Sequence, residues 1–172
     1  TSLLSPLIHW HLKRRLQQGK ENLQRFPERL GIPGRLRPSG ALVWIHTASV
    51  GEALSAVSVI KYLVEEDPLL MIMITTGTVT AADVIQPHLP ERAFHQFLPV
   101  DLPKAVNQFL DHWQPTLTLW FESEIWPNLL MALQRRHLPV FLVNACLSDR
   151  SFRMWKRFPF PMRTLLRVFQ RI

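Results

Sequence analysis

Glu52 is a candidate catalytic residue because of its chemical type and its neighbours. It ends the segment Ser49-Val50-Gly51-Glu52, and a carboxylate beside a binding cleft can act as a general base that accelerates a reaction by ~10²–10⁴. The same segment also fits a capping box, in which Ser49 and Glu52 each bind the other's backbone amide at the start of a helix. The spacing therefore predicts either a base or a helix cap, and the residues alone do not choose between them.

Glu122 and Glu124 offer a second pair of carboxylates further along the chain. Because they are two residues apart, they point to the same side if the backbone is extended. One of them could orient an acceptor hydroxyl, or could raise the pKa of Glu52 through the repulsion of like charges. The alternative is that one of them caps a helix that begins near Trp126-Pro127, since proline suits the first turn of a helix.

Hydroxyl and amide side chains form a third group of candidates. Thr76 and Thr78, in the segment Thr75-Thr76-Gly77-Thr78, could bind a phosphate or a sugar, or could equally cap a helix. Asn144 begins a further polar segment that runs to residue 151. The chain contains neither G-x-G-x-x-G nor G-x-x-x-x-G-K-[ST], so nucleotide binding through these loops is not supported.

Metal-binding patterns are missing from the sequence. Its one cysteine, Cys146, excludes a disulfide framework and a cysteine-based zinc site. His46, His95 and His137 are far apart in the sequence, and we expect each of them to be packed in the core or solvated. We therefore predict no metal site.

The elements that must position these residues follow from the apolar pattern. Short apolar runs are typical of strands in a parallel sheet that is covered on both faces, and they occupy residues 42–45, 69–74, 94–98, 117–121 and 140–143. The segments between them have the length and periodicity of helices, at residues 52–65, 78–86, 103–112 and 126–136. This alternation predicts an α/β fold with a Rossmann-like, doubly wound parallel sheet. Ligands of such sheets bind beyond the carboxyl ends of the strands, which is where the candidate residues fall.

Composition and charge narrow the function classes. The chain has 172 residues, of which 47% are hydrophobic, and this excludes a wholly disordered protein. No apolar run approaches the ~18 residues that span a bilayer. We expect a basic amphipathic segment with a linker over residues 1–40, a domain over residues 41–150, and a basic helical segment over residues 151–172. The two basic segments, residues 1–40 and 151–172, also contain aromatic residues. Such segments can bind an anionic membrane surface or single-stranded nucleic acid, and composition does not distinguish between these two ligands.

Several segments together resemble the 3-deoxy-D-manno-octulosonic acid (Kdo) transferases of lipopolysaccharide assembly. The match runs in order from about residue 6 to the end of the chain, and its blocks are Trp44 to Glu52, Thr75 to Thr78, Leu98 to Pro103, Glu122 to Leu129 and Val143 to Ser151. The resemblance implies an inverting glycosyltransferase of the two-domain GT-B type, of which this chain is the N-terminal, acceptor-side half. Such an enzyme would transfer Kdo from CMP-Kdo to the lipid A precursor, lipid IVA.

The resemblance also implies roles for individual residues. The family's catalytic base falls on Glu52 and a second catalytic carboxylate falls on Glu122. Acceptor contacts are expected from Ser49, Gly51, Thr76, Thr78, Glu124 and Asn144. No cofactor and no metal are expected, and the donor would be bound by a domain that this chain does not contain. We therefore expect the 172 residues alone to be inactive.

The expected partners are the lipid A precursor, CMP-Kdo and an anionic membrane surface, with no nucleic acid. The location would be the cytoplasmic side of the inner membrane, reached through the N-terminal segment. One departure from the family is Cys146, which stands where the family usually has arginine, so any anion contact made at that position is in doubt. Two alternatives stay open: a GT-B transferase of other specificity, and a non-catalytic α/β domain that binds anionic lipid or nucleic acid.

Overall fold

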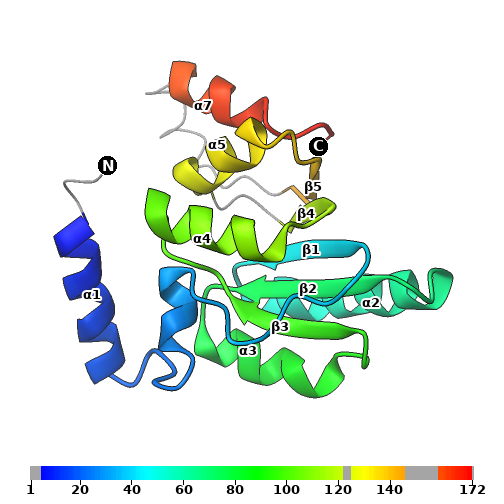
Figure 1. The fold of residues 1–172 in the computed structure, drawn as a ribbon, viewed down its shortest axis with the longest axis horizontal. Helices are drawn as coiled ribbons and strands as arrows, with labels where there is room; N and C mark the ends of the chain where they lie inside the picture. The colour runs from blue at the N-terminus through cyan, green and yellow to red at the C-terminus, as the bar shows by residue number, and fades with distance from the viewer. Residues whose placement is uncertain (1–4, 122–124, 146–158, 172) are drawn as a thin grey trace.

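In the computed structural model, the chain folds into a five-stranded sheet with helices on both faces (Figure 1). The structure describes residues 5–121, 125–145 and 159–171. The strands are β1 (Leu42–Thr47), β2 (Met71–Thr76), β3 (Ala93–Phe97), β4 (Leu117–Phe121) and β5 (Val140–Val143). The helices are α1 (Ser5–Gln17), α2 (Val50–Glu66), α3 (Val79–Ile85), α4 (Pro103–Trp113), α5 (Pro127–Arg135) and α7 (Pro159–Leu166), with short 3-10 helices η2 (Phe26–Leu30) and η3 (Gln86–His88). The predicted fold class is confirmed, and the predicted strands and central helices agree with these bounds to within two residues.

All the strand pairs are parallel, and the strand order is β3-β2-β1-β4-β5. The chain thus builds the sheet outward in one direction from β1 to β3 and then returns to place β4 on the other side of β1. His46 of β1 stands opposite Thr75 of β2 and Trp120 of β4. The order reverses between β1 and β4, which is the point where doubly wound sheets bind their ligands.

Two apolar cores lie on the two faces of the sheet, because successive side chains of a strand point to opposite faces. Leu42 and Trp44 pack in the core that is shared with α4, α5 and α7. Val43 and Ile45 pack in the core that is shared with α2. Every residue of β1 is buried, which is why this strand reads as a continuous apolar run rather than an alternating one.

Residues that the sequence assigned to a linker before β1 pack against the sheet. Glu28 and Arg29 of η2 are 4% and 5% exposed. The backbone O of Arg29 accepts a hydrogen bond from the backbone N of Val100 at 2.8 Å, just beyond β3. The side chains of this segment also bind β3, since Oε2 of Glu28 accepts from the backbone N of Phe97 at 2.8 Å. The N-terminal region is therefore joined to the open edge of the sheet.

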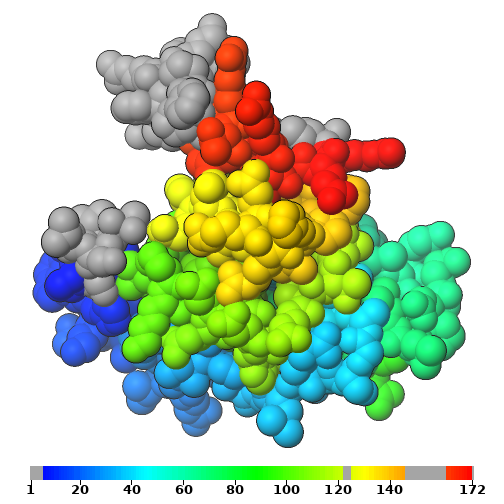
Figure 2. All heavy atoms as spheres, turned by 45° about the horizontal axis from the view of Figure 1, so that its top comes forward, coloured from blue at the N-terminus to red at the C-terminus, as the bar shows by residue number. Residues whose placement is uncertain are grey.

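Helix α1 (blue) lies at one end of the molecule, and α2 extends to the other end (Figures 1 and 2). The N-terminal segment is helical as expected, and it buries Leu12 whereas Leu7 and Trp10 are 60% and 57% exposed. None of the helices in the described ranges is both long enough and apolar enough to cross a bilayer. At the other end of the chain, Arg171 forms a parallel bridge with Phe141, so the chain after α7 runs alongside β5.

Candidate functional site

The turn after β1 carries Glu52 and holds its side chain from two sides. Ser49 is the N-cap of α2, and its Oγ accepts a hydrogen bond from the backbone N of Glu52 at 3.2 Å. In return, Oε2 of Glu52 accepts a hydrogen bond from the backbone N of Ala48 at 2.8 Å. A helix cap of the kind the sequence predicts is therefore present, although the carboxylate reaches one residue further back than in a capping box.

Within the described residues, the helix cap uses only one oxygen of the Glu52 carboxylate. The residue is 6% exposed, and within the described ranges its Oε1 takes no hydrogen bond. Ser49 and Gly51 are exposed beside it, and a Cβ built on Gly51 would meet none of the described atoms within 4 Å. The cap thus orients the carboxylate through one oxygen, and this capping role does not exclude the predicted role of Glu52 as a base.

The turn after β2 places two of the predicted threonines in different environments. Thr76 is fully buried, and its Oγ1 donates to the backbone O of Thr78 at 3.0 Å and lies 2.9 Å from Nε2 of His95. Thr78 is exposed and is the N-cap of α3, where its Oγ1 accepts from the backbone N of Ala81 at 3.2 Å. The capping role is therefore confirmed for Thr78, and Thr76 shapes the turn from within.

Two of the three histidines are packed, as expected. His46 is completely buried in β1 beside β2, and its Nδ1 lies 3.0 Å from Oγ1 of Thr75. Burial lowers the pKa of His46 to about 3. Burial, helped by the nearby Arg25 and Arg29, lowers the pKa of His95 to about 3 as well. Both rings are therefore neutral at physiological pH.

Asp101 caps the helix that flanks the β4 side of the site. Its Oδ1 accepts from the backbone N of Leu129 at 2.8 Å, and its Oδ2 accepts from the backbone N of Asn128 at 3.0 Å. Burial raises the pKa of Asp101, although these hydrogen bonds oppose the shift. The sequence interpretation considered a carboxylate of the preceding segment for this cap. Glu122 and Glu124 themselves lie outside the described residues.

A groove of about 630 Å³ lies between α1 and the carboxyl edge of the sheet. Its lining is mainly apolar and includes Leu7, Ile8, Trp10, Leu12, Leu98, Pro99, Val100 and Trp126. Ala48, Gly77 and Thr78 bring the ends of β1 and β2 into the same lining. The backbone amide of Ala48, a lining residue, binds the carboxylate of Glu52, but Glu52 itself is not among the described lining residues.

The structure brings some of the predicted site residues together and leaves others apart. Ser49, Gly51 and Glu52 share the first turn of α2, next to the groove. Asn144 is exposed with φ of 52° directly after β5, which is two strands away from β1. Glu122, Glu124 and Cys146 lie outside the described residues, and their predicted roles stay predictions. Within the described ranges, no three His, Cys, Asp or Glu side chains form a group that could hold a metal ion.

Sequence reasoning missed charged residues of the groove, among them Arg29 and Asp101. Both are buried or partly buried and bind backbone groups that are distant in the sequence. Asp101 belongs to the block from Leu98 to Pro103 that resembles the Kdo transferases, and this resemblance could have marked it as a candidate site residue. No feature of the sequence marked Arg29 as a site residue, because a charged side chain next to a turn is normally solvated.

Comparison with known proteins identifies the family. The model of the family described as 3-deoxy-D-manno-octulosonic-acid transferase (kdotransferase) matches residues 24–172. The chain belongs to the Kdo transferase family. Among its relatives, a probable mitochondrial 3-deoxy-D-manno-octulosonic acid transferase of Arabidopsis thaliana is 44% identical over 152 residues, covering 88% of this chain and 34% of the relative. The Haemophilus influenzae transferase is 35% identical over 143 residues, covering 83% of this chain and 34% of the relative. The chain thus spans about a third of the length of these curated relatives.

Solved structures show the same fold at low sequence identity. The UDP-GlcNAc 2-epimerase of Neisseria meningitidis is similar with a TM-score of 0.52 and 15% identity, covering 76% of this chain and 39% of that one. MurG of Acinetobacter baumannii is similar with a TM-score of 0.50 and 10% identity, covering 77% and 40%. At these identities the likeness concerns the fold alone, and it agrees with the Rossmann-like, doubly wound parallel sheet that the sequence predicted.

Proposed function

We propose that this chain is the acceptor-side half of an inverting glycosyltransferase that moves Kdo from CMP-Kdo to the lipid A precursor of lipopolysaccharide. The observation that carries the proposal is the position of Glu52. Its carboxylate lies at the end of β1, next to the reversal of strand order, and is bonded to a residue that lines the groove. Family membership supports the sugar and the reaction class.

In this mechanism Glu52 is the general base. Oε2 stays bonded to the amide of Ala48, which fixes the plane of the carboxylate, while Oε1 takes the proton from an acceptor hydroxyl. The deprotonated oxygen attacks the anomeric carbon of Kdo from the face opposite the phosphate. The bond from that carbon to the phosphate oxygen of CMP breaks with its electrons going to CMP, so the configuration is inverted and CMP leaves. The donor would be held by a part of the enzyme outside these 172 residues, so we expect the chain alone not to turn over.

The acceptor side of the proposal rests on the groove. A lipid precursor has apolar chains and a charged headgroup, and the groove combines an apolar lining with the charged residues Arg15, Glu21, Arg29 and Asp101. The adjoining α1 exposes Leu7 and Trp10, with the guanidinium of Arg14 lying 5.7 Å from the centre of the Trp10 ring. An amphipathic helix with this combination can lie on an anionic membrane surface. We propose that α1 places the groove at the cytoplasmic face of the inner membrane.

The decisive experiment replaces Glu52 with glutamine in the full-length transferase. The amide oxygen of glutamine can still accept from Ala48, so the cap and the fold should survive, but glutamine cannot take a proton. We expect Glu52→Gln to reduce transfer of Kdo to the lipid acceptor by ~10²–10⁴. Glu66→Gln is the matched control, because Glu66 is an exposed carboxylate at the other end of the same helix. Normal transfer by Glu52→Gln would show that the base is another group.

The alternative functions predict different results. A non-catalytic domain that binds nucleic acid should bind an oligonucleotide with a steep dependence on salt and should be indifferent to Glu52→Gln. A GT-B transferase of other specificity should lose activity in Glu52→Gln but should use a different sugar nucleotide or acceptor. Testing CMP-Kdo against other sugar nucleotides with the unmodified protein separates these cases.

A further inference from the structure

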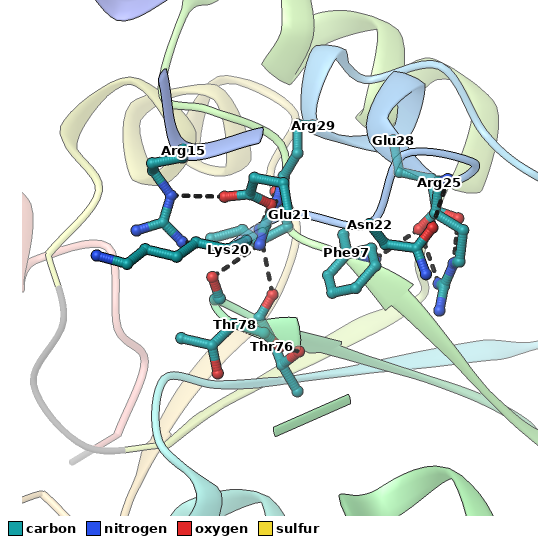
Figure 3. A network of polar contacts seen from close by, with 12 residues as sticks. Arg15, Lys20, Glu21, Asn22, Arg25, Glu28, Arg29, Thr76, Thr78 and Phe97 are labelled. Atoms are coloured by element: carbon teal, nitrogen blue, oxygen red, sulfur yellow. Dashed lines mark hydrogen bonds and ion pairs between the residues drawn. The ribbon is translucent and has the colours of Figure 1, made fainter. Parts of the chain in front are cut away.

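A buried arginine joins the two loops that follow β2 and β3. Nη2 of Arg29 donates to the backbone O of Gly77 at 2.8 Å, and its Nη1 donates to the backbone O of Leu98 at 3.1 Å. Nε of the same guanidinium donates to Oε2 of Glu21 at 2.9 Å. Figure 3 shows Glu21 between Arg29 and Arg15, whose own Nε donates to Oε1 of Glu21 at 2.6 Å. One guanidinium thus uses all three of its nitrogens on groups from three separate segments.

The partners of Arg29 are parts of the groove. Gly77, Leu98, Glu21 and Arg29 itself all belong to its lining. Gly77 and Leu98 lie just beyond the last paired residues of β2 and β3, Thr76 and Phe97, and Nη1 of Arg29 also lies 3.5 Å from the backbone O of Thr76. The loops that shape this side of the groove are therefore held by a side chain from a distant segment.

The cost of burying this charge argues for a specific use. Arg29 is 5% exposed, and burial lowers the pKa of its guanidinium even though Glu21 opposes the shift. Replacing a buried ion pair by apolar residues of similar size often leaves a protein as stable or more stable, so general stability is a weak reason for such a pair. A planar guanidinium can bridge two carbonyls in fixed directions, which an apolar side chain or a lysine cannot do.

We propose that Arg29, oriented by Glu21, is a positioning residue that fixes the loops at Gly77 and Leu98 and thereby sets the affinity for the acceptor. The proposal rests on the proposed function for the identity of the ligand. Arg29 acts through the loops, since it holds their backbone and leaves the proton transfer to Glu52.

The neighbouring Arg25 provides a matched control. It comes from the same segment, is paired with Glu28 by two hydrogen bonds of 2.7 and 2.8 Å, and also donates to a backbone carbonyl, that of His95 at 3.0 Å. Its guanidinium lies over the ring of Phe97 at 4.4 Å, as that of Arg29 does at 4.6 Å. Arg25 binds the side of β3, however, and is absent from the groove lining within the described residues. Arg25→Lys and Arg29→Lys therefore remove similar hydrogen bonds to backbone carbonyls, but only those of Arg29 involve carbonyls of the groove lining.

The first measurement is hydrogen–deuterium exchange of this chain, followed by mass spectrometry of its peptides. Arg29→Lys keeps the charge next to Glu21 but cannot bridge both loops, so we expect exchange over residues 76–82 and 98–102 to become about tenfold faster, equivalent to ~1.4 kcal/mol. Arg25→Lys should leave residues 76–82 unchanged. Unchanged exchange over both loops in Arg29→Lys would overturn the proposal. If Arg29→Lys does not fold, Glu21→Gln tests the same point, because it keeps the guanidinium but removes the negative charge that orients it.

The second measurement is steady-state kinetics of the full-length transferase with the lipid A precursor and CMP-Kdo. We expect Arg29→Lys to raise the KM for the lipid acceptor about tenfold with kcat within about twofold, and Arg25→Lys to change neither. A general loss of folded enzyme would lower the apparent kcat instead. Faster loop exchange with an unchanged acceptor KM would overturn the link between Arg29 and the acceptor, while leaving the proposed function intact. Failure of the proposed function itself would appear separately, as normal transfer by Glu52→Gln.

Discussion

Replacing Gly31 with alanine tests whether the segment between α1 and β1 is an integral part of the domain. Gly31 ends η2 with φ of 82°, a left-handed conformation that side chains of L-residues rarely adopt. A Cβ at this position would lie 2.1 Å from the backbone O of Ala105 in α4. Because the clash is with backbone, no side chain can rotate away to relieve it.

The expected loss of stability in Gly31→Ala is the sum of the backbone strain and the steric clash. An alanine in the left-handed conformation costs ~1–2 kcal/mol, and forcing an extra methyl group into a packed contact costs ~1–3 kcal/mol. We expect Gly31→Ala to lower the free energy of unfolding by about 3 kcal/mol. Gly19→Ala is the matched control, because Gly19 has φ of 68° but none of the described atoms lies within 4 Å of its Cβ position.

Urea unfolding followed by tryptophan fluorescence provides the assay, since Trp44, Trp113 and Trp120 are fully buried. With a urea dependence of ~2 kcal/mol per molar, a difference of ~2 kcal/mol between the two variants separates their midpoints by ~1 M. Equal midpoints for Gly31→Ala and Gly19→Ala would refute the reasoning, because they would mean that η2 does not pack on α4.

Three further predictions concern pH, a helix cap and the membrane. The pKa values of His46 and His95 are lowered to about 3 in the folded protein. As the pH falls below ~6.5, these histidines therefore take up protons in the unfolded chain but not in the folded one. The free energy of unfolding should then drop by up to ~1.4 kcal/mol per histidine per pH unit between pH 6.5 and pH 3. Urea unfolding at pH 7 and pH 5 checks this, and His95→Gln should reduce the pH dependence. Asp101→Ala should cost ~1–2 kcal/mol of unfolding free energy by removing the cap of α5, and a melting curve that matches the parent would contradict the assignment. Trp10→Ala should weaken binding to anionic vesicles about tenfold, whereas Tyr62→Ala, on the exposed side of α2, should not change it; equal effects would argue against docking through α1.

Local signals in the sequence were sufficient for most of the fold. The apolar runs of the strands and the periodicity of the helices are properties of neighbouring residues, so the predicted ranges for β4 and β5 match the observed ones. The helix start at Ser49 was predictable for the same reason, because an N-cap and the residue three positions later interact within one turn. The fold class further predicted the edge of the sheet at which Ser49, Glu52 and Thr78 would be found.

The sequence alone determined which segments form strands and helices and which ends of them carry polar residues, because hydrophobic periodicity and capping act over a few residues. Only the tertiary structure decided that Asp101 caps a helix beginning 26 positions later, and that Arg29 and Glu28 are buried against β2 and β3. These contacts depend on which distant backbone groups are left unpaired at the edge of the folded sheet. The residues next to a charged side chain in the sequence do not reveal whether it will bind such a group. Its burial therefore cannot be predicted until the arrangement of the strands is known.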